Sequence, residues 1–213
     1  ALFTRDDFVE EATAHTRELL SLFDSVIEKS PLAFKARDAS DIEKAARSGK
    51  VAAFLAIEGG EAIGNDLDNL VKFYEQGVRL LTITWNRRNL LARGVGTAGD
   101  DGLSRLGKDA IRLMDSLGMI VDVSHLSDQA FYELLDVATK PIVASHSNSR
   151  SLCPHPRNLS DDQARKIAAT GGLIAITFAG LFIDEKPENV SLARLAEHID
   201  HLVSVAGIDH IGL

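Results

Sequence analysis

The 213-residue sequence contains a single cysteine, Cys153, so it cannot form an internal disulfide bond. Proteins with so little cysteine are typical of a reducing compartment, and we therefore expect a cytoplasmic location. Leu152 and Pro154 flank this cysteine, and no motif places a base beside it. We expect a buried thiol rather than a nucleophile.

Long apolar runs and positive charge are also scarce. No run approaches the roughly 20 residues that a membrane-spanning helix requires, so this span gives no reason to expect a membrane partner. The sequence has 23 Lys and Arg against 31 Asp and Glu, which gives a net charge of −8. A phosphate backbone would require a basic surface, so we expect no nucleic-acid partner.

Hydrophobic residues make up 45% of the chain, enough for a packed core, and they occur in two kinds of pattern. Short apolar runs predict strands over residues 51–57, 78–84, 119–123, 142–144, 173–178 and 210–213. Apolar residues at helical spacing predict helices over residues 4–30, 40–49, 66–76, 104–118, 127–137, 160–171 and 191–207. Ser40 with Glu43 has the pattern of a capping box at the start of the second helix.

The regular alternation of strands and helices predicts parallel strands covered by helices. It fits a β/α barrel or a doubly wound sheet. No Gly-x-Gly-x-x-Gly follows the early strands, which disfavours the dinucleotide-binding form of the doubly wound sheet. Composition does not change abruptly along the chain, so we predict one domain over residues 1–213.

Potential metal ligands follow three of the predicted strands. Glu58, His125 and His146 each lie at the C-terminal end of a different strand. In a β/α barrel those ends share one face, where active sites are built. One carboxylate and two imidazoles on that face make a donor set suited to zinc. Taken singly, each residue also fits an ordinary turn or helix-entry position.

Further polar residues extend this picture. Arg157 lies in the loop after His146, and a guanidinium can bind a carboxylate through two parallel hydrogen bonds. His198 and His201 lie three residues apart on the last predicted helix, a spacing that could hold a metal. Because Leu195 and Leu202 mark the core side of that helix, we interpret both histidines as solvated or rim residues.

Five short motifs occur in order along the chain. They are Ile57-Glu-Gly-Gly60, Leu81-Thr-Ile-Thr84, Asp122-Val-Ser-His125, Ser145-His-Ser147 and Pro156-Arg-Asn158. Together they resemble the membrane (renal) dipeptidase family of zinc peptidases over essentially the whole chain. The resemblance implies an α/β fold, a (β/α)8 TIM-like barrel. Residues 1–3 would be the tail of its second strand and residues 210–213 the start of its eighth, so we expect this chain to lack strand 1 and the end of strand 8.

The resemblance also implies a zinc-dependent dipeptidase and assigns the site residues. Glu58 would be catalytic and bridge two zinc ions, with His125 and His146 binding one of them. A hydroxide shared by the metals would attack the peptide bond of a dipeptide whose C-terminal carboxylate Arg157 holds. The family's His-x-Asp ligand pair and its final Asp have no match here. We therefore expect at most one zinc ion in this span, which alone is expected to be inactive; a homodimer is compatible with the resemblance.

One position departs from the family pattern inside the matched motifs. Where some members carry a histidine near the scissile carbonyl, this sequence has Trp85. We take Trp85 and Asn86 as candidate substrate-binding residues, with Arg87 and Arg88 as further substitutes for the histidine. This departure leaves one alternative open, and the missing ligands leave a second. One is a related metal-dependent amidohydrolase acting on N-acyl amino acids or cyclic amides, and the other is a truncated barrel that binds a ligand without catalysis.

Overall fold

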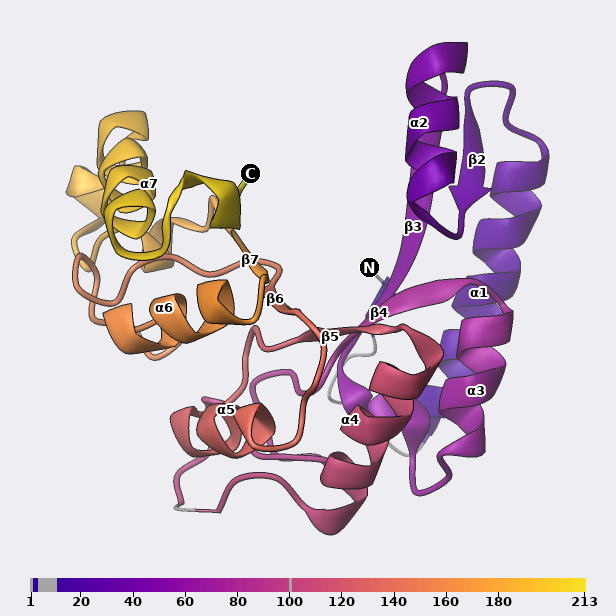
Figure 1. Cartoon of the computed structure of the whole chain (residues 1–213), viewed down its shortest axis with the longest axis horizontal. Coiled ribbons are helices and arrows are strands. Elements are labelled where there is room, and N and C mark those ends of the chain that lie inside the picture. The colour runs from indigo at the N-terminus through magenta and orange to yellow at the C-terminus, as the bar shows by residue number, and fades with distance from the viewer. Residues whose placement is uncertain (1, 4–10, 100) are drawn as a thin grey trace.

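The computed structural model describes residues 2–3, 11–99 and 101–213 (Figure 1). The predicted start of the first helix lies outside these residues. The strands are β1 (Leu2–Phe3), β2 (Ala33–Ala36), β3 (Val51–Glu58), β4 (Val78–Thr82), β5 (Ile120–Asp122), β6 (Ile142–Ala144), β7 (Leu173–Ala175) and β8 (Ile211–Gly212). The α-helices are α1 (Ala12–Glu28), α2 (Ala39–Ser48), α3 (Asp68–Glu75), α4 (Arg105–Leu117), α5 (Asp128–Leu135), α6 (Asp161–Ala169) and α7 (Leu192–Ala206).

The strands form one curved parallel sheet. Its order is β1-β3-β4-β5-β6-β7-β8, so each strand after β3 lies beside the next one in sequence. The sheet curls into part of a barrel, with α3 to α6 on its convex side (Figure 1). In the described part of the chain, β1 and β8 do not pair with each other, so the barrel is open there. The predicted TIM-like α/β architecture is confirmed.

β2 is a strand that the sequence analysis did not predict. Its residues Ala33–Ala36 pair in parallel with Val51–Phe54, in the first half of β3, and the strand lies off the main path of the sheet. Four residues of the pattern Ala-Phe-Lys-Ala, with a charged side chain among them, are too few to produce a period of two. Long-range pairing with β3 therefore makes this strand, rather than a local signal.

Four helices begin with a serine cap at their predicted first residue, and the one capping box that was predicted is not formed. Four serines stand at the predicted start of their helices, and the side chain of each accepts the backbone N–H of the residue three positions later; they are Ser104, Ser127, Ser160 and Ser191. The capping box predicted at Ser40 and Glu43 is wrong. Asp38 is the N-cap, and its carboxylate accepts the N–H groups of Ser40 and Asp41 at 2.9 and 3.3 Å. A carboxylate satisfies these free donors as well as a hydroxyl does, and it begins the helix two residues earlier.

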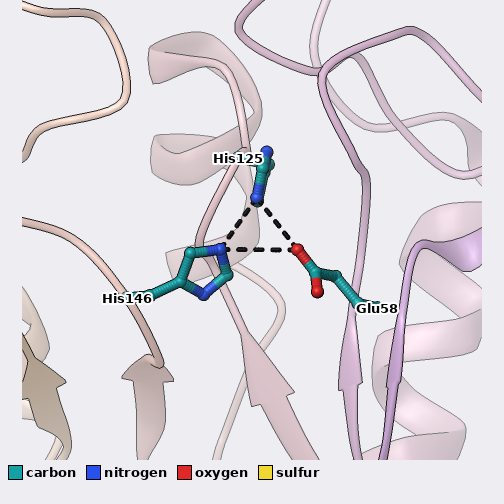
Figure 2. A group of neighbouring side chains, drawn as sticks. All are labelled: Glu58, His125 and His146. Carbon is teal, nitrogen blue, oxygen red and sulfur yellow. Dashed lines mark hydrogen bonds and ion pairs between the residues drawn. The ribbon is translucent and has the colours of Figure 1, made fainter. Parts of the chain in front are cut away.

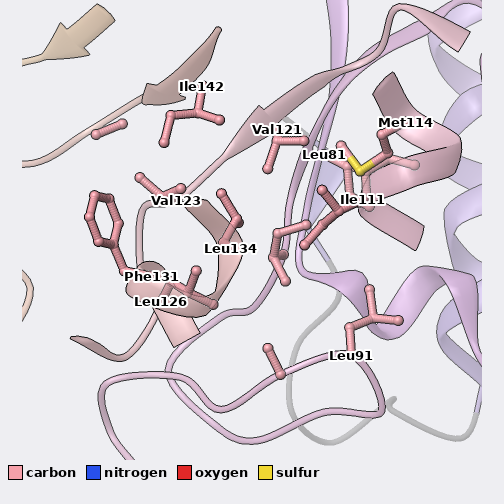
Figure 3. Close-up of a cluster of buried hydrophobic side chains, with 14 of the residues drawn as sticks. Leu81, Leu91, Ile111, Met114, Val121, Val123, Leu126, Phe131, Leu134 and Ile142 are labelled. Atoms are coloured by element: carbon pink, nitrogen blue, oxygen red, sulfur yellow. The ribbon is translucent and has the colours of Figure 1, made fainter. Parts of the chain in front are cut away.

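A continuous apolar core joins the sheet to the helices outside it. Ile111 of α4, Phe131 of α5 and Leu81 of β4 belong to one cluster of buried side chains (Figure 3), and each is at most 1% exposed. This core fixes the strands, and with them the side chains at the strand ends, in place. Within the described residues, no helix is both long and apolar enough to span a bilayer.

The packing of α5 leads to a test of this fold. We expect Phe131→Ala to lower the free energy of unfolding by about 3–5 kcal/mol, because it removes a ring that is 1% exposed and leaves a cavity. Leu192→Ala is the control, since Leu192 is 81% exposed and its loss should change stability by less than about 0.5 kcal/mol. Urea denaturation of both variants measures the difference, and similar losses for the two would contradict the packing described.

Candidate metal centre

Glu58, His125 and His146 meet at the C-terminal edge of the sheet (Figure 2). Glu58 is the last residue of β3, and the two histidines follow β5 and β6. Glu58 Oε1 lies 3.2 Å from His125 Nε2 and 3.4 Å from His146 Nε2, and the two Nε2 atoms are 2.8 Å apart. The sheet therefore brings together the three side chains that the sequence predicts as ligands. Among the described residues, no other such group of His, Cys, Asp and Glu is placed to hold a metal.

The ring of His125 presents a lone pair to the other two side chains. Its Nδ1 lies 2.8 Å from the side-chain oxygen of Asn86, which can only accept a hydrogen bond. The proton therefore sits on Nδ1, and Nε2 is left as an acceptor. An acceptor nitrogen beside a second imidazole and a carboxylate oxygen requires a cation or a proton between them, so this donor set fits a metal ion.

The backbone of His125 is held in an unusual conformation. With a φ of 70°, it is the one non-glycine residue of positive φ among the described residues. The long loop before α4 holds it there, because Val95 N–H donates to the His125 carbonyl at 2.9 Å. Gly94 allows this approach, since a Cβ on it would lie 2.2 Å from the Trp85 carbonyl oxygen. Such strain persists where surrounding contacts impose it, as they do here beside the predicted site.

The charges in the site favour the protonation states that metal ligands need. Contact with the His125 and His146 rings holds the pKa of the Glu58 carboxyl well below its usual range, although burial opposes this effect. Burial lowers the pKa of His125, and the positive charge of Arg157 adds to this effect while Glu58 opposes it. At neutral pH the carboxylate is therefore ionised and the His125 ring neutral, which are the forms that coordinate a cation.

Arg157 lies beside the three candidate ligands and is 5% exposed. Its Nη2 donates to the His146 carbonyl at 3.1 Å, and its guanidinium lies 5.5 Å from the centre of the Phe182 ring. Burial lowers its pKa to about 10, against the opposing charges of Asp122 and Glu58, so it stays a cation at pH 7. Its Nε–H is buried and has no hydrogen-bond partner among the described residues. A buried cation with an unused donor is suited to receive an anion.

Trp85 and Asn86, the predicted substrate-binding residues, both lie next to His125. The Trp85 ring is half-buried, with its centre 6.0 Å from that of His125. The Asn86 side chain contacts His125 itself through the hydrogen bond to Nδ1. The structure thus places both residues at the site, and their contact with a substrate stays a prediction.

Sequence reasoning gave no role to Asp122, and it misjudged His198. Asp122 is fully buried at the end of β5 and accepts hydrogen bonds next to His146. An acidic residue inside an apolar strand was the signal available for it.

His198, predicted to be solvated or at the rim, is 0% exposed. Its Nδ1 accepts from Ser149 N–H at 3.1 Å and its Nε2 donates to the Ile183 carbonyl at 2.8 Å, so this ring joins two loops to α7.

Comparison with known proteins matches this chain to one family. The sequence profile described as membrane dipeptidase (peptidase family M19) matches residues 1–213. An uncharacterized protein in the pqqA 5′ region of Klebsiella pneumoniae is 37% identical over an alignment of 185 residues, which covers 82% of this chain and 68% of that protein. Dipeptidase tcpJ of Claviceps purpurea is 34% identical over 180 residues, 84% of this chain and 42% of that protein.

A solved structure agrees with these sequence matches. It is a metallo peptidase from Rhodobacter sphaeroides liganded with a phosphinate mimic of the dipeptide L-Ala-D-Ala. It is 28% identical with a TM-score of 0.90, and the match covers 99% of this chain and 62% of that chain. This chain thus spans 42% to 68% of the length of these three proteins. It belongs to the membrane dipeptidase family, peptidase family M19, a family of metallo-dipeptidases with a TIM-barrel fold.

Proposed function

We propose that the full-length gene product is a zinc-dependent dipeptidase and that Glu58, His125 and His146 bind a catalytic zinc ion. The observation that carries this proposal is the convergence of one carboxylate oxygen and two imidazole Nε2 atoms, with ligand atoms that all lie within 4.8 Å of one another. Mixed nitrogen and oxygen donors of this kind are typical of catalytic zinc sites, which keep a position open for water or substrate.

Each side chain has a distinct part in this proposal. A bound zinc ion would polarise the peptide carbonyl and make a water molecule acidic enough to ionise near neutral pH. Glu58 contributes the negative charge and is the catalytic carboxylate, with Oε1 turned toward both imidazoles. Asn86 orients the His125 ring through Nδ1. These residues are held before substrate arrives, so little reorganisation is needed during the reaction.

Arg157 is the proposed anchor for the substrate. Arg157 is 5% exposed as a residue and keeps an unused N–H, so a carboxylate that reaches it is bound where water competes little. The cation faces Phe182 and is fixed by the His146 carbonyl, which limits its freedom. A dipeptide has its free carboxylate one residue beyond the scissile bond, a spacing that suits an anchor beside the metal ligands. The relative liganded with a dipeptide mimic supports this substrate class.

Metal binding tests the centre directly. We expect His146→Ala to weaken zinc binding by at least about 100-fold, more than the loss of an outer-shell partner, because one of three ligands disappears. His201→Ala is a matched control, since the side chains are 30% and 26% exposed and His201 also contacts one carboxylate, that of Asp161. Chelator competition gives the affinities. Zinc binding unchanged in His146→Ala would place the metal elsewhere.

The anchor is tested by removing its charge. Arg157→Ala should raise KM for dipeptides roughly 10- to 100-fold, the value of a lost charge-assisted hydrogen-bond pair, and should change KM little for the corresponding dipeptide amides. Arg112→Ala is the control, because Arg112 pairs with Asp109 on the exposed side of α4 and its loss should leave both substrates unaffected. Steady-state kinetics on the two substrates decides, and equal losses for both would remove Arg157 from this role.

The described residues supply three ligands, which limits what this span does alone. We expect residues 1–213, purified by themselves, to bind at most one zinc ion per chain and to hydrolyse dipeptides little or not at all. Metal analysis by mass spectrometry and a dipeptidase assay measure both properties. Zinc-dependent turnover by this span alone would show that its own side chains complete the site.

Trp85 keeps a second candidate open. It stands where some family members have a histidine and lies beside His125, so the acyl side of the substrate can differ from that of a dipeptide. The alternative is an amidohydrolase acting on N-acyl amino acids or cyclic amides. A substrate panel separates the two, since turnover of these amides without turnover of dipeptides would favour the alternative.

A further inference from the structure

Asp122 lies behind the metal centre and joins three strand ends. Its Oδ1 accepts the backbone N–H groups of Ser124 and Ser145, both at 3.0 Å. Its Oδ2 accepts the hydroxyls of Thr82 and Ser145 at 2.7 and 2.6 Å. The side chain is 0% exposed, so these four donors take the place of water around it. A carboxyl group that accepts at four positions and donates at none is an ionised carboxylate.

The hydroxyl of Ser145 connects this carboxylate to His146. Ser145 Oγ is 2.6 Å from Asp122 Oδ2 and 2.7 Å from His146 Nδ1. The short oxygen–oxygen contact needs a proton between the two atoms, and the hydroxyl has one to give. Its remaining lone pair therefore faces His146, so the proton of the neutral ring sits on Nδ1. His146 Nε2 is then an acceptor, directed at Glu58 and His125.

We infer that Asp122, acting through Ser145, is a positioning residue that fixes His146 in the tautomer able to bind the metal. The inference rests on the proposed metal centre, and it gives Asp122 and Ser145 a role although neither of them is a candidate ligand. Other contacts hold the His146 backbone, since Ser124 Oγ accepts its N–H at 3.1 Å and Arg157 donates to its carbonyl. These contacts place the residue, while the Asp122–Ser145 pair sets its proton.

The two histidines are thus oriented by different means. His125 donates to the neutral amide oxygen of Asn86, whereas His146 donates to a hydroxyl that a buried carboxylate polarises. A carboxylate behind a ligating histidine raises the basicity of the ring nitrogen that binds the metal. Losing such a partner typically weakens metal binding about 10- to 100-fold. We therefore expect zinc affinity to fall more when the partner behind His146 is changed than when the partner behind His125 is changed.

Asp122→Asn reverses the direction of this hydrogen-bond chain with little change in shape. Because the backbone N–H groups of Ser124 and Ser145 require an acceptor, the amide oxygen faces them and the NH2 group faces the Ser145 hydroxyl. That hydroxyl then donates to His146 Nδ1, and the ring proton moves to Nε2, inside the metal site. We expect zinc affinity of the full-length gene product to fall roughly 10- to 100-fold.

Three further variants separate tautomer control from a structural role. Ser145→Ala removes the connection and should weaken zinc binding as Asp122→Asn does, whereas Ser145→Thr keeps the hydroxyl and should bind like the wild type. Thr82→Val is the matched control, because it deletes the other hydroxyl on Asp122 Oδ2 but has no contact with His146. It should lower stability while leaving zinc affinity within about threefold, since each hydrogen bond contributes about 1 kcal/mol to folding.

The experiment measures zinc affinity by chelator competition and, in the zinc-loaded protein, the His146 ring proton by 1H–15N NMR. An Nδ1–H signal in the wild type, with reduced affinity in Asp122→Asn and Ser145→Ala but not in the other two variants, supports the inference. Wild-type affinity in folded Asp122→Asn, or an equal loss in Thr82→Val, overturns it. If Asp122→Asn does not fold, Ser145→Ala against Ser145→Thr decides in the same way. A wild-type protein that binds no zinc rejects the metal centre itself.

Discussion

The close approach of three acceptor atoms from three strands is the constraint around which this site is built. His125 Nε2, His146 Nε2 and Glu58 Oε1 lie 2.8 to 3.4 Å apart, and without a cation or proton between them their lone pairs would repel one another. The parallel order β3-β4-β5-β6 brings the three strand ends to one edge. The apolar core behind the sheet resists the relaxation that this repulsion would otherwise cause.

Each acceptor depends on a contact that holds its side chain from behind. The ring of His125 is oriented by Asn86, and its backbone stays at a φ of 70° because Val95 donates to its carbonyl. His146 depends on the pair Ser145 and Asp122. Burying the charge of Asp122 is costly, and its four hydrogen bonds offset that cost. The residues that hold the candidate ligands from behind therefore belong to the site, and burying them has a cost in folding free energy that their own hydrogen bonds must offset.

The sequence predicted that Glu58, His125 and His146 converge because the relevant signals were local. Short apolar runs indicated the strands, and the polar residues that follow three of them are Glu58, His125 and His146. What it missed depends on distant partners: Asp122 bonds a hydroxyl 40 residues away in Thr82, and His198 accepts from an N–H 49 residues away. The predicted end of one strand was wrong for a related reason. The strand predicted over residues 78–84 is β4, whose ladder ends at Thr82, and the prediction ran past it because Ile83 and Thr84 stay buried after pairing stops.

In the proposed function, Arg157 connects recognition of the substrate to the protonation state of the candidate metal ligands. Its guanidinium donates to the His146 carbonyl, so an anion bound by Arg157 lies next to the backbone that carries a ligand. The same positive charge lowers the pKa of His125 and so favours a neutral ring, which is the form a metal requires. Burial strengthens the interaction of this cation with an anion, but it also costs hydration free energy. The nearby negative charges of Asp122 and Glu58 offset that cost. The residue that receives the substrate in this proposal therefore also favours the metal-binding form of His125 through its charge.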